Sequence, residues 1–135
     1  MRNALIKKLV MLMVFLAADA FADELKTPLE VVNARMKAHN ENNLKLFLEA
    51  YSEDIQIYGY PNVPFGKPGK EHIKSIFGPL FDDKAVHTEI HHQIENGRYV
   101  INHETVVRQG KTTVYVSIYE VVNGKIKSVR FINDQ

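Results

Sequence analysis

The residue best suited to chemistry in this sequence is a histidine in the middle of a run rich in Val, Ile and Thr. His103 lies between the dipeptides Asn96-Gly97 and Gln109-Gly110, which favour tight turns between antiparallel strands. Counting from these turns places its imidazole on the inner face of a sheet, beside Ile101 and Thr105. Burial keeps an imidazole neutral near pH 7, and a neutral imidazole can accept a proton. His103 is therefore the candidate catalytic residue, and a structural histidine bonded to one partner is the alternative.

His92 and two tyrosines are candidates to complete a binding site. In the same register His92 lies diagonal to His103, at roughly 7–8 Å between backbones, so the two rings could share a ligand. Tyr58 and Tyr60 end a strand-like run beside a loop rich in Pro and Gly, where their phenols could border a pocket; ordinary aromatic packing is the alternative. The expected ligand-binding residues are Tyr58, Tyr60, His92, Ile101, Thr105, Val116, Ile118 and Phe131.

One histidine-rich string resembles a metal motif. His87, Glu89 and His91 alternate onto one side of a strand, but this is the predicted outer side. Alternate side chains of a strand stand nearly 7 Å apart, and no fourth ligand is evident. The sequence has no cysteine, and the stretch from Gly66 to Lys70 lacks the spacing of a phosphate-binding loop. We therefore expect neither a metal site nor a cofactor.

Helices come first in the chain. Thr27 and Pro28 have the residue types of a helix N-cap and first turn, and a short second helix is expected around Leu44 to Leu48. A strand follows at Ile55 to Tyr58, then a Pro/Gly-rich loop at Pro61 to Gly69. A third helix is expected from Lys70 to Phe77, ending at Gly78-Pro79.

The remaining chain predicts a four-stranded antiparallel meander. Its turns are Asn96-Gly97, Gln109-Gly110 and Asn123-Gly124. If each dipeptide is the turn centre, Ile90 faces His103, His92 faces Ile101, Ile118 faces Val129 and Val116 faces Phe131. The inner face would then comprise Ile90, Ile94, Ile101, His103, Val114, Val116, Ile118, Val129 and Phe131.

The opposite, outer face of this meander is too apolar for a free surface. Its apolar members are Val100, Val106, Tyr115, Tyr119 and Ile132. We therefore predict a homodimer that pairs through the outer sheet face.

The first residues have the layout of a secretory signal peptide. Basic residues Arg2, Lys7 and Lys8 precede an apolar stretch of about ten residues and a small-residue exit at Ala20 to Ala22. The apolar stretch is short for a bilayer-spanning helix, which needs about 20 residues. We expect residues 1–22 to be the signal peptide, residues 23–135 to form one domain, and the mature protein to be periplasmic or secreted with no membrane attachment.

Composition excludes several functions. The signal holds three of the 17 basic residues and one of the 16 acidic ones, which leaves the mature chain with a formal charge of −1. No basic surface for nucleic acid is therefore expected. The absence of cysteine excludes disulfides and thiol chemistry.

Several segments resemble the SnoaL-like group of the nuclear-transport-factor-2-like superfamily, also described as the cystatin-like cone. The resemblance covers Thr27 to Asp134. The segments that carry it are Tyr51–Ile55, Gly78–Phe81, Val100–Glu104, Ile118–Glu120, Gly124–Ile126 and Val129–Ile132. The resemblance implies an α+β fold in which N-terminal helices pack on a curved antiparallel sheet to form a cone with an internal pocket.

The resemblance implies a small-molecule pocket and leaves the chemistry open, because the superfamily includes isomerases, cyclases, hydrolases and noncatalytic binders. The ketosteroid isomerase positions fall at Gly59 or Tyr60, at Met36, and at Ile118 or Tyr119, and no inward carboxylate is expected to replace them. We expect a protein that binds, and in one reading transforms, a small and largely apolar ligand. The alternative is a noncatalytic ligand-binding or protein-interaction module of the cell envelope.

Overall fold

The computed structural model describes residues 25–134, so the predicted signal peptide lies outside the described residues. Helix α2 (Pro28–Asn40) begins where Thr27 Oγ1 accepts a hydrogen bond from the Glu30 amide at 3.2 Å. Helix α3 (Leu44–Glu49) begins in the same way, with Asn43 Oδ1 accepting from the Leu46 amide at 3.1 Å. Side-chain oxygens at these positions satisfy amides that a helix start leaves free, so both helices form where the sequence predicts them.

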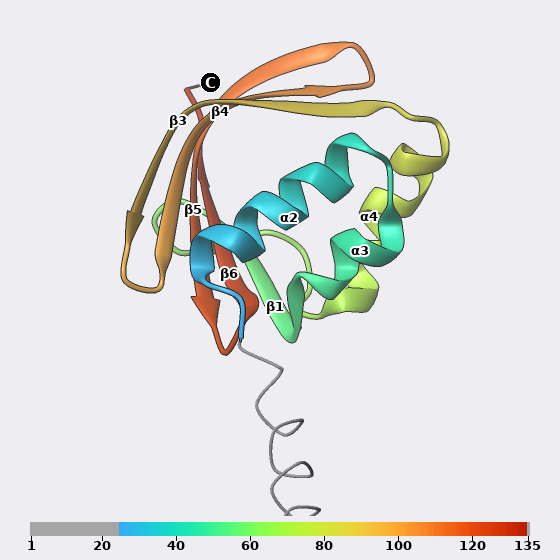
Figure 1. Cartoon of the computed structure of the whole chain (residues 1–135). Coiled ribbons are helices and arrows are strands. Elements are labelled where there is room, and N and C mark those ends of the chain that lie inside the picture. Colours follow the sequence, from blue (N-terminus) through green and yellow to red (C-terminus); the bar gives the residue numbers. More distant parts are fainter. Residues whose placement is uncertain (1–24, 135) are drawn as a thin grey trace, which may run out of the picture.

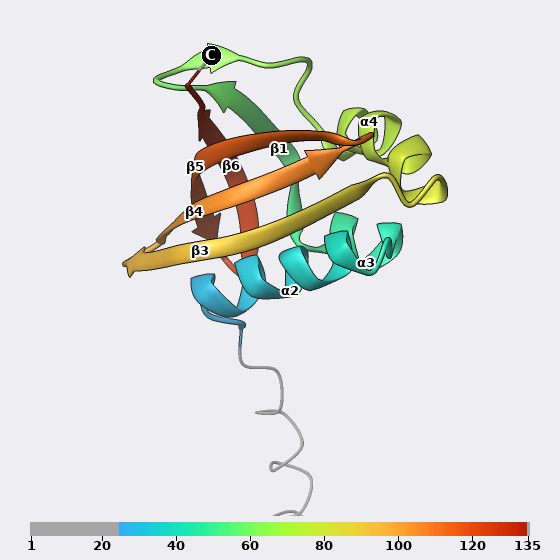
Figure 2. The same cartoon turned by 90° about the horizontal axis from the view of Figure 1, so that it is seen from above.

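A single curved sheet wraps around these helices (Figures 1 and 2). Its strands are β1 (Tyr51–Gly59), β2 (Val63–Pro64), β3 (Val86–Asn96), β4 (Tyr99–Arg108), β5 (Lys111–Val122) and β6 (Lys125–Ile132). They lie in the order β2-β1-β6-β5-β4-β3. The predicted antiparallel meander is confirmed for β3 to β6. The sheet as a whole is mixed, because β1 pairs with β6 in parallel.

Helix α4 (Lys70–Asp82) is longer than predicted. It continues through Gly78 and contains Pro79 in its interior. Leu80 and Phe81, which follow the proline, are buried in the core. Their burial outweighs the cost of the missing proline amide. None of the helices among residues 25–134 is long and apolar enough to cross a membrane.

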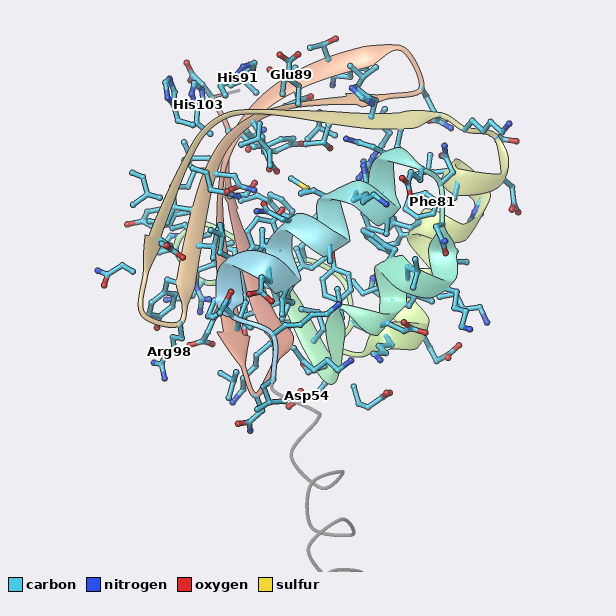
Figure 3. All side chains as sticks on the ribbon, viewed as in Figure 1. Asp54, Phe81, Glu89, His91, Arg98 and His103 are labelled. Atoms are coloured by element: carbon cyan, nitrogen blue, oxygen red, sulfur yellow. The ribbon has the colours of Figure 1, made fainter. Side chains whose placement is uncertain are left out.

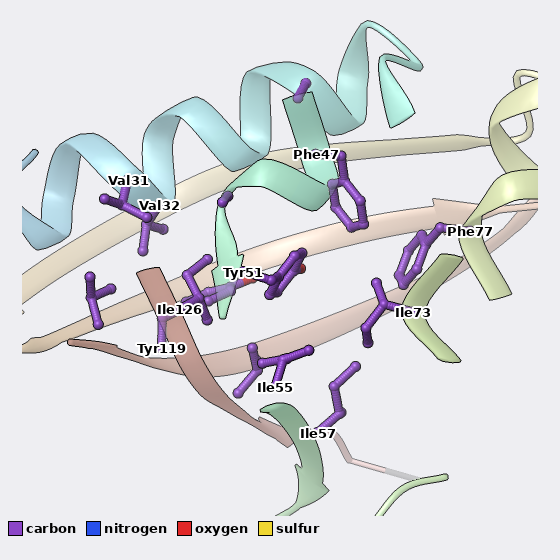
Figure 4. Packing of buried hydrophobic residues seen from close by; sticks show 14 of the residues in the cluster. Val31, Val32, Phe47, Tyr51, Ile55, Ile57, Ile73, Phe77, Tyr119 and Ile126 are labelled. Atoms are coloured by element: carbon purple, nitrogen blue, oxygen red, sulfur yellow. The ribbon is translucent and has the colours of Figure 1, made fainter. Parts of the chain in front are cut away.

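The core lies between the helices and the concave side of the sheet (Figure 4). Phe47 of α3 is fully buried, and its ring centre lies 4.8 Å from that of Phe77 and 5.0 Å from that of Phe81. Tyr51 adds an edge-on contact to Phe47 at 5.2 Å. Aromatic rings at these separations and tilts attract one another beyond the area that they bury. This aromatic cluster holds α3 and α4 together against β1.

The register of two hairpins differs from the prediction. In the β3–β4 hairpin Asn96 pairs with Tyr99, so the turn is centred on Gly97-Arg98 instead of Asn96-Gly97, and His92 faces His103. A bulge at His91 then shifts the rest of the ladder, so Ile90 faces Glu104. The β5–β6 hairpin starts as predicted at Asn123-Gly124, but it shifts after Glu120. A bulge adds one residue to a strand and changes the side to which the following residues point.

The predicted inner and outer faces of β4 and β5 are exchanged. Asn102, Glu104, Ser117 and Tyr119 are almost fully buried, whereas Val114 is 51% exposed. Ile94 of β3, also predicted inside, is 61% exposed. The error has a physical cause, because each face carries both apolar and polar side chains and apolar content alone could not choose between them. Val129 and Phe131 obey the prediction, since the bulge in β6 turns them toward the helices. Ile90 of β3 also lies on the concave side as predicted, because it pairs with the buried Glu104.

Candidate functional site

A cavity of about 290 Å³ lies between α2, α4 and the concave side of the sheet. This volume is at the lower end of the range usual for ligand pockets, roughly 300–1,000 Å³. Most of its wall is apolar or aromatic. The lining residues are Arg35, His39, Ile57, Tyr58, Gly59, Phe65, Ile76, Phe77, Thr88, Glu104, Val106, Arg108, Tyr115, Phe131 and Asn133.

Only two of the predicted site residues, Tyr58 and Phe131, line this cavity. Tyr60 follows β1 and is 58% exposed. The others lie on the convex side of the sheet, away from the helices: His92, Ile101, His103, Thr105, Val116 and Ile118. The exchanged faces of β4 and β5 account for this outcome, and His92 lies on the convex side because it pairs with His103.

His103 itself is exposed, so its prediction as a buried pocket residue is wrong. Figure 3 shows His91 and His103 on the outside of the sheet. The His103 ring stacks on that of His92 at 5.9 Å between centres, and it lies 5.4 Å from that of His91. His91 Nε2 also contacts Thr105 Oγ1 at 2.6 Å. The three rings form a surface cluster that does not reach the cavity.

A different histidine, His39 in the last turn of α2, lines the cavity. It is 2% exposed and lies among the rings of Phe47, Phe77 and Phe81, with centres 5.5–6.0 Å away. Burial, with a further contribution from the positive charge of Arg35, lowers the pKa of His39 to about 3. His39 is therefore neutral throughout the physiological pH range.

The neighbouring Asn40 fixes which nitrogen of His39 carries the proton. Asn40 Nδ2 donates to the carbonyl of Thr88, and Asn40 Oδ1 accepts from the Thr88 amide, both at 2.8 Å. This double hydrogen bond sets the orientation of the amide group. His39 Nδ1 lies 3.3 Å from the same Oδ1, which can only accept, and 3.4 Å from Thr88 Oγ1, which can accept as well. Both contacts are satisfied when Nδ1 carries the proton, and we assign the tautomer on this basis. The lone pair of Nε2 is then left as an acceptor on a ring that lines the cavity.

Arg35 lies one turn before His39 on the same side of α2. Its Nε donates to the hydroxyl of Tyr51 at 2.8 Å, and one terminal nitrogen, Nη1, approaches Met36 Sδ at 2.8 Å. The guanidinium lies over the rings of Phe47 and Tyr119, at 4.9 and 5.6 Å from their centres. These contacts hold a permanent positive charge in a site where only 4% of the residue is exposed.

Glu104 provides a carboxylate on the sheet side of the cavity. It is 1% exposed and accepts hydrogen bonds from Ser117 Oγ at 2.7 Å, Asn102 Nδ2 at 3.2 Å and Tyr119 OH at 3.5 Å. Burial raises the pKa of Tyr119, so its hydroxyl remains a donor. The expectation that no carboxylate points inward is therefore wrong.

Arg35, His39 and Glu104 were missed because they come from two elements that the sequence does not pair. Arg35 and His39 are four residues apart, which places them on one face of a helix, and that face also contains the buried Val32 and Met36. A charged residue in an apolar stripe is a usable signal for this half of the site. Glu104 is adjacent to His103, which was expected inside, so Glu104 was expected on the outer face and was missed when the faces of β4 proved to be exchanged.

The chemistry open to the site is hydrogen bonding and acid–base chemistry at oxygen and nitrogen. His39 Nε2 and the Glu104 carboxylate accept protons or hydrogen bonds, and Arg35 donates. Within residues 25–134 no group of three or more His, Asp or Glu side chains is arranged to hold a metal ion.

The fold is a cone of helices and curved sheet whose concave side borders a cavity of mixed polarity. A model of the SnoaL-like domain matches residues 32–129, and the chain belongs to this family. No curated protein sequence matches it.

Solved structures share the fold at low sequence identity. An NTF2-like protein of unknown function from Cytophaga hutchinsonii is 19% identical, with a TM-score of 0.72 over 84% of this chain and 95% of that one. An uncharacterized cystatin fold protein from Novosphingobium aromaticivorans is 23% identical, with a TM-score of 0.71 over 79% and 98%. An LEH-like epoxide hydrolase from M. tuberculosis is 16% identical, with a TM-score of 0.64 over 79% and 82%. At these identities the likeness establishes the fold and leaves the reaction open.

Proposed function

We propose that this protein is an exported binder of a small, largely apolar molecule that carries a hydrogen-bonding group. The observation that supports this proposal is the cavity of about 290 Å³, with apolar walls and with Arg35, His39 and Glu104 buried at its polar end. Burying three polar or charged groups costs free energy unless hydrogen bonds or opposite charges compensate for the lost water. A ligand that hydrogen-bonds to them gives the arrangement a use.

Catalysis is a further step on the same site. The structural neighbours of this fold include an epoxide hydrolase. In this chain the lone pair of His39 Nε2 lies at the cavity, where it could accept a proton from a bound molecule. Its pKa of about 3 makes it a weak base. The site is therefore better suited to accepting a hydrogen bond from a ligand than to removing a proton from carbon, and we favour binding over turnover.

Filling the cavity should abolish binding. Val106 lines the cavity, whereas the adjacent Val107 points to the convex side. With 4-propylphenol as the probe, we expect Val106→Trp to weaken binding at least about tenfold, because the indole occupies the apolar volume. Val107→Trp, the matched control, should bind as the wild-type protein does. Isothermal titration calorimetry measures both.

The cavity would be the wrong site if the two tryptophan variants bound the probe equally well. Absence of binding to the wild-type protein at millimolar probe would also count against a pocket for small apolar molecules. Circular dichroism checks that both variants are folded.

We also propose that two copies pair through the convex face of the sheet. This face carries the exposed side chains of Ile94, Val114 and Ile132 and the partly exposed Ile101, Val116 and Ile118. Of the residues first expected here, Val100, Val106, Tyr115 and Tyr119 point inward and only Ile132 lies outside. The surface is nonetheless apolar, and pairing it with the same surface of a second copy removes the apolar side chains of both chains from water.

A charge in the middle of this face should separate the copies. We expect the wild-type protein to have the mass of a dimer at high micromolar concentration in multi-angle light scattering, and Ile118→Glu to have that of a monomer. Val63→Glu, in the exposed edge strand β2, is the control and should remain dimeric. A monomeric wild-type protein, or a dimeric Ile118→Glu variant, would rule out this interface.

A further inference from the structure

The polar end of the cavity holds two opposite charges that do not touch each other. Arg35 and Glu104 both line the cavity and are almost fully buried. Yet the ion pairs of residues 25–134 do not include one between them. Opposite charges in a medium of low dielectric constant attract strongly. Because both residues line the same cavity and are not paired with each other, a polar group of a ligand in that cavity can approach both.

The hydrogen bonds of these two residues define what that group must offer. Arg35 uses Nε on Tyr51 and Nη1 on Met36, and Nη2 has no partner within the described part of the chain. Glu104 accepts two hydrogen bonds at Oε1 and one at Oε2, although a carboxylate has about four acceptor positions. The two N–H groups of Arg35 Nη2 and one acceptor position of Glu104 are thus available to the cavity.

His39 adds a second acceptor, because Asn40 holds the proton on its Nδ1 and leaves Nε2 without a hydrogen bond among residues 25–134. A hydroxyl group fits this set, since it can accept from Arg35 and donate to Glu104 or His39. A carboxylate fits poorly, because it has no proton to donate and would lie near the Glu104 carboxylate.

Near Arg108, by contrast, the cavity favours a carboxylate. Arg108 lines the cavity, is exposed at the end of β4, and has no carboxylate partner in the described structure. Its guanidinium lies 5.5 Å from the centre of the Phe77 ring, which orients it beside the cavity wall. A guanidinium held in this way is a ready partner for an anion.

Apolar side chains make up much of the remaining wall of the cavity. Ile57, Phe65, Ile76, Val106 and Phe131 line the cavity, so the body of the ligand must be apolar. Resting on the proposed function, we infer that the ligand is a small hydroxy acid: an apolar skeleton with a hydroxyl group at the Arg35–Glu104 end and a carboxylate at Arg108.

Four related probes test this inference by calorimetry. The complete probe is 3-(4-hydroxyphenyl)propionate, 3-phenylpropionate lacks the hydroxyl, 4-propylphenol lacks the carboxylate, and tyramine replaces the carboxylate with a cation. We expect the complete probe to bind most tightly, with a loss of about tenfold on removing either polar group. Tyramine should bind more weakly than 4-propylphenol, because its ammonium lies beside Arg108.

Variants assign each end of the ligand. Arg108→Gln should weaken binding of the hydroxy acid about tenfold and leave 4-propylphenol unchanged, whereas Lys111→Gln, which removes a neighbouring exposed charge across the β4–β5 turn, should change neither. Equal affinity for the hydroxy acid and 4-propylphenol, or an Arg108→Gln variant that binds both as wild type does, would overturn the inference while the cavity remains a binding site. Failure of every probe to bind, by contrast, would count against the proposed function itself.

Discussion

Acid should unfold this protein over a pH range set largely by one buried histidine, His39. Its pKa is about 3 in the folded protein and about 6.5 in the unfolded chain. Between these values the unfolded chain binds a proton that the folded protein does not. Stability is therefore complete above pH 6.5 and declines as the pH falls toward 3. The full effect is about 5 kcal/mol, and the part above pH 4 is roughly 3 kcal/mol.

Replacing His39 should make the free energy of unfolding depend less on pH. We expect the free energy of unfolding of His39→Gln, from urea titrations between pH 7 and pH 4, to fall by about 3 kcal/mol less than that of the wild-type protein. Its stability at pH 7 is expected to be lower, because Gln does not fill the space among three phenylalanine rings. The change in slope is independent of that loss.

An exposed histidine provides the control for this measurement. His103→Gln removes an imidazole from the convex surface, so its curve should follow that of the wild-type protein. If His39→Gln and the wild-type protein lost stability equally from pH 7 to pH 4, His39 would not be buried in its neutral form. That result would also remove one of the two hydrogen-bond acceptors from the proposed ligand site.

The elements of this fold were predictable because short-range signals fix them. Thr27 and Asn43 cap their helices through hydrogen bonds three residues along the chain. Gly97, Gly110 and Gly124 adopt the positive φ angles that tight turns require. Such features depend on a few neighbouring residues, and those residues are visible in the sequence.

The faces of the sheet were not predictable in the same way, because they depend on bulges and on polar burial. One extra residue in β3, at His91, and another in β6, at Lys127, alter the side to which the residues beyond them point. The sequence contains no sign of either bulge. The buried face is also partly polar, since Asn102 and Ser117 donate to Glu104 inside the protein. Polar side chains that form hydrogen bonds with one another can be buried, and a prediction that buries only apolar residues does not find them.

The errors in the candidate site follow from the exchanged faces of the sheet. Tyr58 and Phe131 of the predicted site line the cavity, and Phe131 does so only because the bulge in β6 turns it toward the helices. His103 was chosen for its place between apolar neighbours, but Ile101 and Val116 belong to the convex surface with it. The helical half of the site was accessible in principle through the spacing of Arg35 and His39.

Removing the buried carboxylate should destabilise the protein more than removal of any surface charge. In Glu104→Leu the side chains of Asn102, Ser117 and Tyr119 lose their shared acceptor, and Arg35 keeps a buried charge with no opposite charge near it. Each buried donor left without an acceptor costs about 1–3 kcal/mol, so the melting temperature should fall by at least about 10 °C. Glu89→Leu, at an exposed position on the same sheet, should change stability by less than about 0.5 kcal/mol.

Adding Arg35→Met to Glu104→Leu should recover part of the loss, because the uncompensated charge is then gone. A double variant no more stable than Glu104→Leu would show that the cost arises from the orphaned donors alone, and a Glu104→Leu variant as stable as the wild-type protein would contradict the electrostatic account of this cavity.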